Sequence, residues 1–167
     1  MRRVVYVSAG VVAAAATGIA VLAQSGSESG SGSDKAPATD VTFLGEPVTA
    51  ANIATGKDLY AQSCAACHGA ALEGQPDWKR RLPNGRMPAP PHDETGHTWH
   101  HSDRNLFEIT RNGVEAVVAG YESDMPAFGA VLTDAEITAV LAYIKSTWPE
   151  RQRAAQAEVT AQDEGGS

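Results

Sequence analysis

The chain is poor in cysteine, in aromatic residues and in positive charge, and each shortage narrows what it can be. Two cysteines among 167 residues cannot supply the four ligands of a closed zinc site without help from histidines. Aromatic residues make up 6 % of the chain, so a domain of this size would have a modest core of its own. Against 20 Asp and Glu there are 13 Lys and Arg, and the resulting net charge of −7 disfavours nucleic acid and favours a partner with a basic surface.

The two cysteines lie together in the segment Cys64-Ala65-Ala66-Cys67-His68. Two cysteines three positions apart, with a histidine directly after the second, have the spacing that attaches a c-type haem. Each thiol adds to one vinyl group of the porphyrin, so the two sulfurs must lie about one helical turn apart. The histidine then falls under the iron, where its imidazole can serve as the proximal ligand. The segment predicts one haem, covalently attached through Cys64 and Cys67 and ligated by His68.

Three other interpretations of the cysteines are open at this point. A redox dithiol of the thioredoxin kind is expected in a βαβ unit, and no alternating β-branched run precedes Cys64. A disulfide between Cys64 and Cys67 would close too short a loop to add much stability. A zinc site would leave the histidine beside Cys67 unexplained, and it would need two ligands from the histidines His92, His97, His100 and His101.

The first 24 residues are typical of an export signal. Arg2 and Arg3 precede an apolar run over residues 4–23, which is long for a signal peptide and just long enough to span a bilayer. Residues 25–48 are rich in Gly, Ser and acidic residues, and we expect a flexible linker there, which favours an uncleaved anchor over a removed signal. Either way, the rest of the chain is expected on the periplasmic side of a bacterial inner membrane, anchored or soluble.

The folded domain is expected over residues 49–149, followed over residues 150–167 by a polar tail that begins as a frayed helical extension. Asn52 is a candidate N-cap for a first helix that carries Gly56 and Tyr60 on one face and runs into the cysteine motif. Prolines and glycines then recur through the sequence, which predicts a long loop between the motif and Trp99. A loop of this length needs something to pack against, and a flat prosthetic group would serve.

Two further helices are predicted from capping signals. Ser102 or Asp103 can begin a short helix that ends near Gly113. Thr133 opens a capping box, and the helix behind it carries an apolar stripe that should end before Pro149.

This order of elements resembles the class I cytochrome c family: a CxxCH motif after a first helix, a long loop, a Met-Pro dipeptide and an amphipathic last helix. The resemblance implies an all-α fold of about three to five short helices wrapped around one covalently attached haem. It also implies that the first and last helices cross, with Gly56 and Tyr60 meeting Val140 and Tyr143.

The resemblance implies a second axial ligand as well. Met125, which precedes Pro126 shortly before the last helix, is where the family places its thioether ligand. Met87 also precedes a proline, but it lies in the long loop, where it could simply fill a gap against the porphyrin. Bis-histidine ligation is the remaining alternative, with His97, His100 or His101 as the second ligand.

Further contacts are expected around the ligand His68. Its second ring nitrogen should donate a hydrogen bond to a backbone carbonyl, and the family pattern suggests the carbonyl of Pro90 or Pro91. Trp99 could donate its indole N–H to a haem propionate, or it could belong to the core. The roles of the histidines at 92, 97, 100 and 101 stay open.

With histidine and methionine as ligands, both axial positions of the iron are filled, which predicts electron transfer and not enzymatic activity. We expect a monomer that carries single electrons between respiratory complexes or dehydrogenases, its donor and acceptor proteins, at the periplasmic face of the inner membrane. Two alternatives are a haem c subunit of a larger oxidoreductase and a haem enzyme, such as a peroxidase, with an open iron position.

Overall fold

The computed structural model describes residues 38–166. The elements come in the order β1 (Ala38–Phe43), β2 (Glu46–Thr49), α1 (Ala50–Ser63), α2 (Ala65–His68), η1 (Thr98–His100), α3 (Asp103–Asn112), η2 (Val114–Ala116), α4 (Asp134–Thr147) and α5 (Glu150–Gly165), where η marks a 3-10 helix. The predicted signal or anchor and the predicted linker as far as residue 37 lie outside the described residues. Within residues 38–166, no helix has both the length and the apolar character needed to cross a bilayer.

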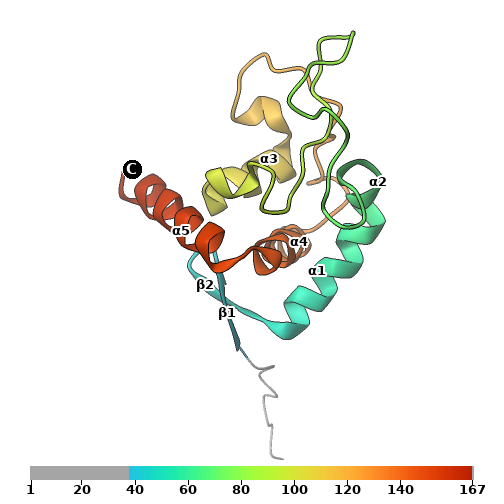
Figure 1. The fold of residues 1–167 in the computed structure, drawn as a ribbon. Helices are drawn as coiled ribbons and strands as arrows, with labels where there is room; N and C mark the ends of the chain where they lie inside the picture. Colours follow the sequence, from blue (N-terminus) through green and yellow to red (C-terminus); the bar gives the residue numbers. More distant parts are fainter. Residues whose placement is uncertain (1–37, 167) are drawn as a thin grey trace, which may run out of the picture. The chain divides into compact units, whose positions relative to one another are not determined.

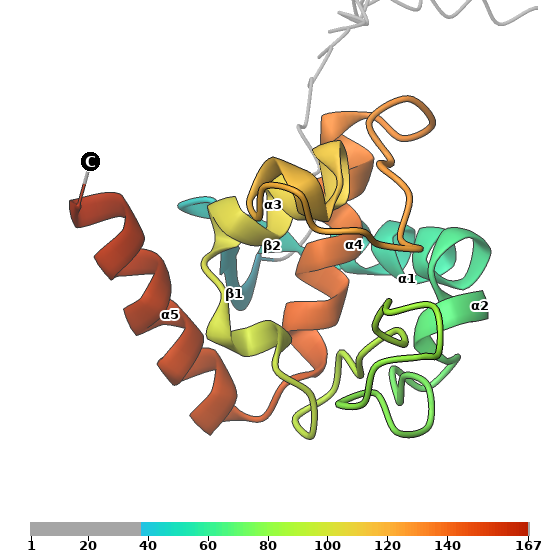
Figure 2. The ribbon, with the colours of Figure 1, turned by 90° about the horizontal axis from the view of Figure 1, so that it is seen from above.

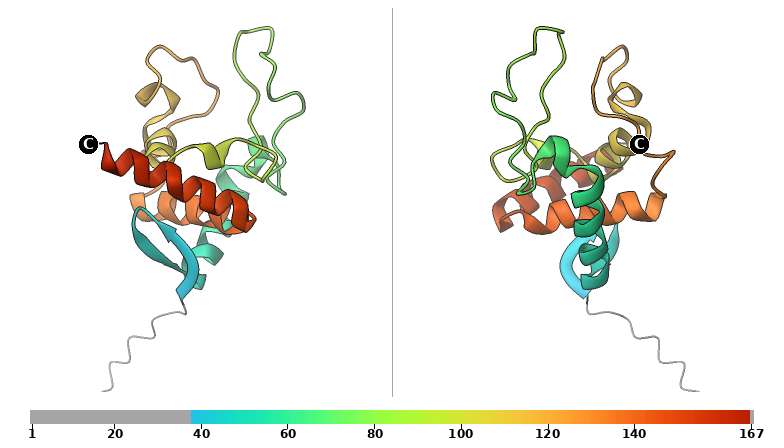
Figure 3. Two further views of the ribbon diagram at one scale, coloured as in Figure 1. Left: turned by 60° about the vertical axis from the view of Figure 1, so that its left-hand side comes forward. Right: turned by 90° about the vertical axis from the view of Figure 1, so that its right-hand side faces the viewer.

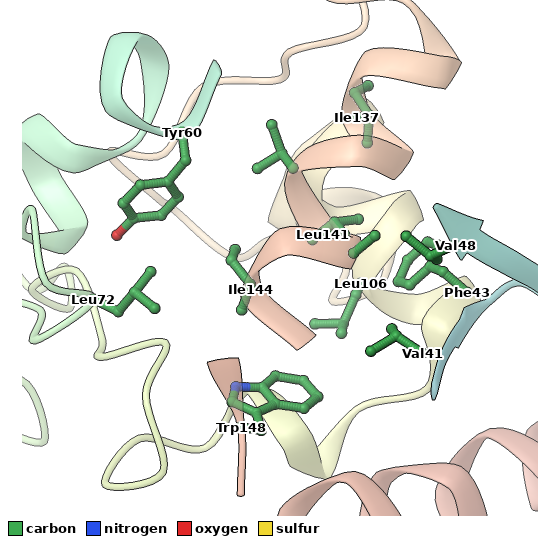
Figure 4. Packing of buried hydrophobic residues seen from close by; sticks show 12 residues of the cluster. Val41, Phe43, Val48, Tyr60, Leu72, Leu106, Ile137, Leu141, Ile144 and Trp148 are labelled. Carbon is green, nitrogen blue, oxygen red and sulfur yellow. The ribbon is translucent and has the colours of Figure 1, made fainter. Parts of the chain in front are cut away.

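The fold is all-α, as the sequence predicted, with a small two-stranded sheet in addition. The last predicted helix, α4, runs through the middle of the described part and contacts α1, α3 and β1 (Figures 1 and 2). Side chains from several elements pack around it, with Tyr60 and Leu72 on one side and those of the sheet on the other (Figure 4). The core is therefore organised around one helix that carries none of the predicted ligands.

The crossing of α1 and α4 requires a glycine. A Cβ atom on Gly56 would lie 1.9 Å from the carbonyl oxygen of Ala139 and 3.0 Å from Cβ of Tyr143, so a larger side chain would push the helices apart. One turn later the rings of Tyr60 and Tyr143 pack at 5.6 Å between centroids. The predicted crossing is present and Tyr143 takes part in it, but the residue of α4 nearest to Gly56 is Ala139 and not the predicted Val140.

Helices α1 and α4 each begin with a capping box. In α1 the cap is Thr49, whose hydroxyl accepts a hydrogen bond from the Asn52 N–H at 3.1 Å, so the prediction that Asn52 caps this helix is wrong. Asn52 instead lies three positions after the cap and accepts from the Thr49 N–H at 3.2 Å, completing the box. In α4 the predicted box is present, since Glu136 accepts from the Thr133 N–H at 2.8 Å.

The predicted linker is folded in its last part. Residues 38–49 form an antiparallel hairpin, in which the turn residues Leu44 and Gly45 have φ values of 51° and 78°. Three apolar side chains of the hairpin are buried against the core: Val41, Phe43 and Val48 (Figure 4). The expectation of a linker as far as residue 48 is therefore wrong for residues 38–48, because apolar residues at alternate positions bury one face of the sheet.

The buried carboxylate of Asp103 joins four elements. It accepts hydrogen bonds from Nζ of Lys145 at 2.9 and 3.1 Å, and from the Leu44 N–H at 2.9 Å. From α5, Nε2 of the fully buried Gln156 donates to it at 2.7 Å. The expected helical extension is thus present over residues 150–165, but it is not frayed: it belongs to the folded body and is held there by a polar side chain and not by an apolar stripe.

Two long loops leave the helical body on the face opposite the hairpin (Figure 3). The first, residues 69–97, joins α2 to η1 and is the loop predicted from proline and glycine. The second, residues 117–133, joins η2 to α4 and contains the predicted methionine ligand. Arg86 of the first loop forms an ion pair with Asp124 of the second. The two loops that carry the predicted ligand contacts are therefore tied to each other.

Candidate functional site

The cysteine motif lies where α1 ends and α2 begins. Cys64 is the C-cap of α1 and the N-cap of α2, and its carbonyl accepts from the Cys67 N–H at 3.1 Å and the His68 N–H at 2.9 Å. Both cysteines are free thiols, Cys64 half-buried and Cys67 exposed. One short helical turn therefore presents both sulfurs and the histidine, as attachment of a c-type haem requires.

The thiol environment does not fit a redox dithiol. Burial, and then the neighbouring Cys67, raises the pKa of the Cys64 thiol to about 11, whereas reactive cysteines have lowered pKa values. In the part of the chain that the structure describes, no group of three or more His, Cys, Asp or Glu side chains is arranged to hold a metal ion. Of the interpretations of this motif, haem attachment is the one that the surroundings fit.

His68 is buried, and one of its ring nitrogens is already engaged. Its Nδ1 lies 2.9 Å from the carbonyl oxygen of Pro90, which is one of the two carbonyls that the family resemblance suggested. A carbonyl can only accept a hydrogen bond, so Nδ1 carries the proton and Nε2 keeps its lone pair. Burial lowers the pKa of His68, and the bond to Pro90 partly opposes that shift. The side chain is therefore a neutral imidazole whose Nε2 lone pair is available, and this is the form of histidine that ligates a metal.

Two glycines allow the first loop to close tightly around the proline pair. A Cβ atom on Gly74, which has φ of +69°, would lie 2.4 Å from the backbone nitrogen of Pro91. On Gly96 it would lie 2.0 Å from the carbonyl oxygen of the same residue. Pro91 is buried between them. Gly74 and Gly96 thus both pack closely against Pro91, next to the carbonyl that bonds His68. Of the two prolines, Pro90 makes the predicted hydrogen bond and Pro91 does not.

A second histidine, to which the sequence assigned no role, packs on His68. The rings of His68 and His92 stack with centroids 4.0 Å apart and an angle of 23° between their planes. In the sequence, the position of His92 directly after the two prolines is the one signal that could have pointed to this contact. Sequence reasoning missed it because the orientation of two side chains depends on how the loop closes.

The indole of Trp99 has an unpaired N–H group. Within residues 38–166, its Nε1 atom is one of two buried side-chain polar atoms without a hydrogen-bond partner, the other being Oε1 of Gln156. The Trp99 ring packs against the core and stacks on His100 at 3.7 Å between centroids. A buried unpaired donor is costly, and a haem propionate would satisfy this one. The residues present therefore fit the predicted haem, while the propionate contact itself stays a prediction.

Met125 lies in the second loop and is half-buried. Its N–H donates to the Ser123 hydroxyl at 3.0 Å, and three residues later the Phe128 N–H donates to the Thr110 carbonyl at 2.9 Å, which anchors the loop to α3. Met87, in the first loop, is half-buried as well. Burial thus does not distinguish the two methionines, and the choice of Met125 as ligand stays a prediction.

The three histidines that come next in the first loop and η1 pack against tryptophans and against each other. His97 stacks on Trp78 at 5.4 Å between ring centroids and meets His101 edge-on at 5.3 Å. Burial, followed by the positive charge that neighbouring histidines would carry, lowers the pKa of His97. His100 stacks on Trp99. These contacts add no support to the bis-histidine alternative.

Comparison with known proteins gives matches of one kind. A profile of the family described as cytochrome c oxidase, cbb3-type, subunit III matches residues 51–144, from α1 to α4. The chain is 29 % identical over 101 residues to cytochrome c-555 of Prosthecochloris aestuarii, covering 56 % of this chain and 85 % of that protein. It is 31 % identical over 104 residues to cytochrome c6 of a Picosynechococcus species, covering 62 % of this chain and 80 % of that protein. No solved structure gives a significant match.

Proposed function

Since the chain belongs to the cytochrome c family described as cbb3-type oxidase subunit III, we propose that it transfers electrons through one haem whose axial ligands are His68 and Met125. As a member of this family, it carries a covalently bound c-type haem, with Cys64 and Cys67 as the attachment points. The haem supplies one-electron redox chemistry, and the protein supplies ligands, burial and a docking surface. The identity of the axial ligands decides whether the iron is closed to small molecules or open to them.

The observation that carries the proposal is the hydrogen bond from His68 to Pro90. At 2.9 Å it engages Nδ1 and leaves Nε2 available, on a histidine that directly follows the second cysteine. A carbonyl partner of this kind sets the orientation of a ligating imidazole and raises its basicity. The proximal side of the proposed site is therefore arranged by the chain itself.

The position of its loop supports Met125 as the second axial ligand. That loop leaves the body on the same face as the loop carrying Pro90 (Figure 3), and Arg86 binds Asp124, the residue directly before the methionine. With side chains on both sides of the iron, small molecules cannot reach it without displacing a ligand, which favours electron transfer over catalysis. Thioether ligation also raises the reduction potential.

We place this carrier on the periplasmic side of the inner membrane, tethered by residues 1–24 or released after their cleavage. The basic and apolar composition of that segment supports export. Its partners are then a quinol-oxidising complex or dehydrogenase as donor and a terminal oxidase or reductase as acceptor. A second candidate, a permanent haem c subunit of an oxidase, is favoured by the family description. Purification from membranes in mild detergent separates the two, because a permanent subunit elutes with its complex.

A pair of methionine variants tests the ligation. In the ferric wild-type holoprotein we expect the long-wavelength absorption band of a thioether–iron bond. Met125→Ala should lose this band, bind carbon monoxide when reduced and have a lower reduction potential, because the sixth position becomes open. Met87→Ala is the matched control and should keep the band. An intact band in Met125→Ala, its loss in Met87→Ala, or its absence from the wild type would each refute ligation by Met125.

A further inference from the structure

The stacking of His92 on His68 is a contact that ligation does not require. The two rings lie nearly parallel, 4.0 Å apart between centroids and 23° between planes. Tyr60 approaches His92 edge-on, with ring centroids 6.3 Å apart and planes at 74°. His92 is thus contacted by two aromatic rings, one of which belongs to the proposed iron ligand.

Both the backbone and the ring of His92 are tightly held. Its N–H donates to the Leu72 carbonyl at 2.8 Å, and its carbonyl accepts from the indole nitrogen of Trp148 at 2.7 Å. Leu72 and Trp148 are both buried in the core. The ring is held separately, because Nδ1 lies 2.8 Å from the hydroxyl of Thr98. Because its backbone and its ring are both held, His92 gives the ring of His68 a fixed surface to pack on.

The hydroxyl of Thr98 also determines the tautomer of His92. It lies 3.3 Å from the carbonyl of Pro91, to which it can donate its single proton. Both contacts of Thr98 are satisfied together only if Nδ1 of His92 carries a proton and donates it to the hydroxyl. The Thr98 hydroxyl therefore fixes which edge of the His92 ring faces it, and with that the orientation of the face that lies on His68.

We propose that His92 is a positioning residue that sets the plane of the His68 imidazole. The proposal rests on the proposed ligation of the iron by His68. The bond to Pro90 fixes the direction of one ring nitrogen, but hydrogen bonds to a carbonyl oxygen tolerate a broad range of orientations. A second ring lying face to face removes that remaining freedom. Pro90 thus sets the direction in which Nδ1 of His68 points, and His92 sets the plane of the His68 ring.

The plane of an axial imidazole matters because it sets how the ligand overlaps the iron orbitals and how unpaired spin spreads over the porphyrin. Residues behind the ligands tune a metal centre in this way, by orienting the ligands that contact it. The effect is visible in two spectroscopic properties of the ferric holoprotein, the g-values of its electron paramagnetic resonance and the pattern of haem methyl shifts in proton NMR. A merely structural contribution of His92 to stability would change neither.

The test uses two substitutions of His92 in the mature holoprotein. His92→Leu removes the flat ring, and we expect shifted g-values and a rearranged order of haem methyl signals. His92→Phe keeps a flat ring without the bond to Thr98, and we expect spectra close to those of the wild type. Glu94→Leu is the control for introducing a leucine elsewhere in the same loop, since Glu94 is exposed, and it should leave the spectra unchanged.

Wild-type spectra in His92→Leu would overturn the proposal, and so would an equally large change in His92→Phe. If the leucine variant does not mature, nuclear Overhauser contacts between the two imidazoles in the wild-type holoprotein decide the question, because their absence means that the rings do not stack. Failure of the proposed ligation is recognised separately: it removes the histidine–methionine signature from the wild type, whichever residue stands at position 92.

Discussion

The segments that supply the two proposed axial ligands are supported in different ways. His68 is 7 % exposed, and its ring contacts the Pro90 carbonyl on one edge and the His92 ring on one face. Met125 is half-buried, and its N–H is bound to the hydroxyl of Ser123, a near neighbour in the same loop. One ligand rests on the core, and the other lies in a loop held mainly at its ends and by surface charges.

This difference indicates where the coordination can change. Displacing His68 would disturb Pro90, His92 and the core residues that hold them, so the histidine side is preset by the fold. Displacing Met125 would require only a local movement of its loop between the anchor at Phe128 and the ion pair at Asp124. Ligand exchange should therefore begin at the methionine side, and substitutions that weaken one support at a time can separate the two sides.

The largest effect is expected from Gly56→Leu, which attacks the support of the histidine side. Because a Cβ atom at this position would lie 1.9 Å from the Ala139 carbonyl oxygen, α1 would be forced away from α4 and would carry the cysteine motif with it. We expect almost no holoprotein, measured as haem-stained yield. Ala54→Leu, on the exposed face of the same helix, should give normal yield. Normal yield and unchanged thermal stability in Gly56→Leu would contradict the close crossing.

A smaller loss is expected when the buried ion pair is broken. Asp103→Leu leaves the charge of Lys145 buried without its partner, which should lower the free energy of unfolding by about 3–5 kcal/mol in urea titrations. Both ligand segments should then unfold together, because the change affects the body on which both depend. The double variant Asp103→Leu/Lys145→Met is the control, and it should recover much of the loss. A single variant no less stable than the double variant would show that the charge is not the cause.

The smallest and most selective effect is expected from Arg86→Gln. Arg86 pairs with Asp124 and lies 3.8 Å from Glu122, but these side chains are well exposed, so the loss of stability should be small. We expect added imidazole to displace the methionine slightly more readily at low salt, and the difference should vanish at high salt.

Arg104→Gln is the control for the loop ion pair. Arg104 bonds Asp163 at 2.8 Å with similar exposure, but it joins α3 to α5 and not the two loops. Its removal should leave imidazole binding unchanged. If both arginine variants changed imidazole binding equally, the link between the loops would not be what restrains Met125.

Local signals made much of the helical framework predictable. The box at Thr133 and the cap at Ser102 are short-range patterns, and the structure contains both. Gly56 was predictable as a contact point because a glycine inside a helix is unfavourable unless something close requires it. The Pro90 carbonyl was predictable from the family resemblance and not from local pattern, since it lies 22 residues from the ring that it binds.

The hairpin, and the docking of α5 on the body, could not be predicted in the same way. Residues 38–48 come after a stretch rich in glycine and serine, and their few apolar residues are too sparse to stand out from it. Helix α5 has no apolar stripe, and the buried side chain that docks it is Gln156, a residue type that is usually exposed. The stacking of His92 on His68 depends on side-chain torsions and on loop closure around Pro91, which no sequence pattern encodes.

The junction at Asp103 has a mechanical consequence. A force applied to the chain ahead of Ala38 would enter β1, which is paired with β2, bound to α5 through Arg153 and Asp40 at 3.0 Å, and held at its turn by Asp103. From there the load passes into α3, α4 and α5 and not through the loops that present Pro90 and Met125. For a protein tethered through residues 1–24, as proposed above, tension on the tether would thus reach the helical framework without passing through the segments that hold the proposed ligands.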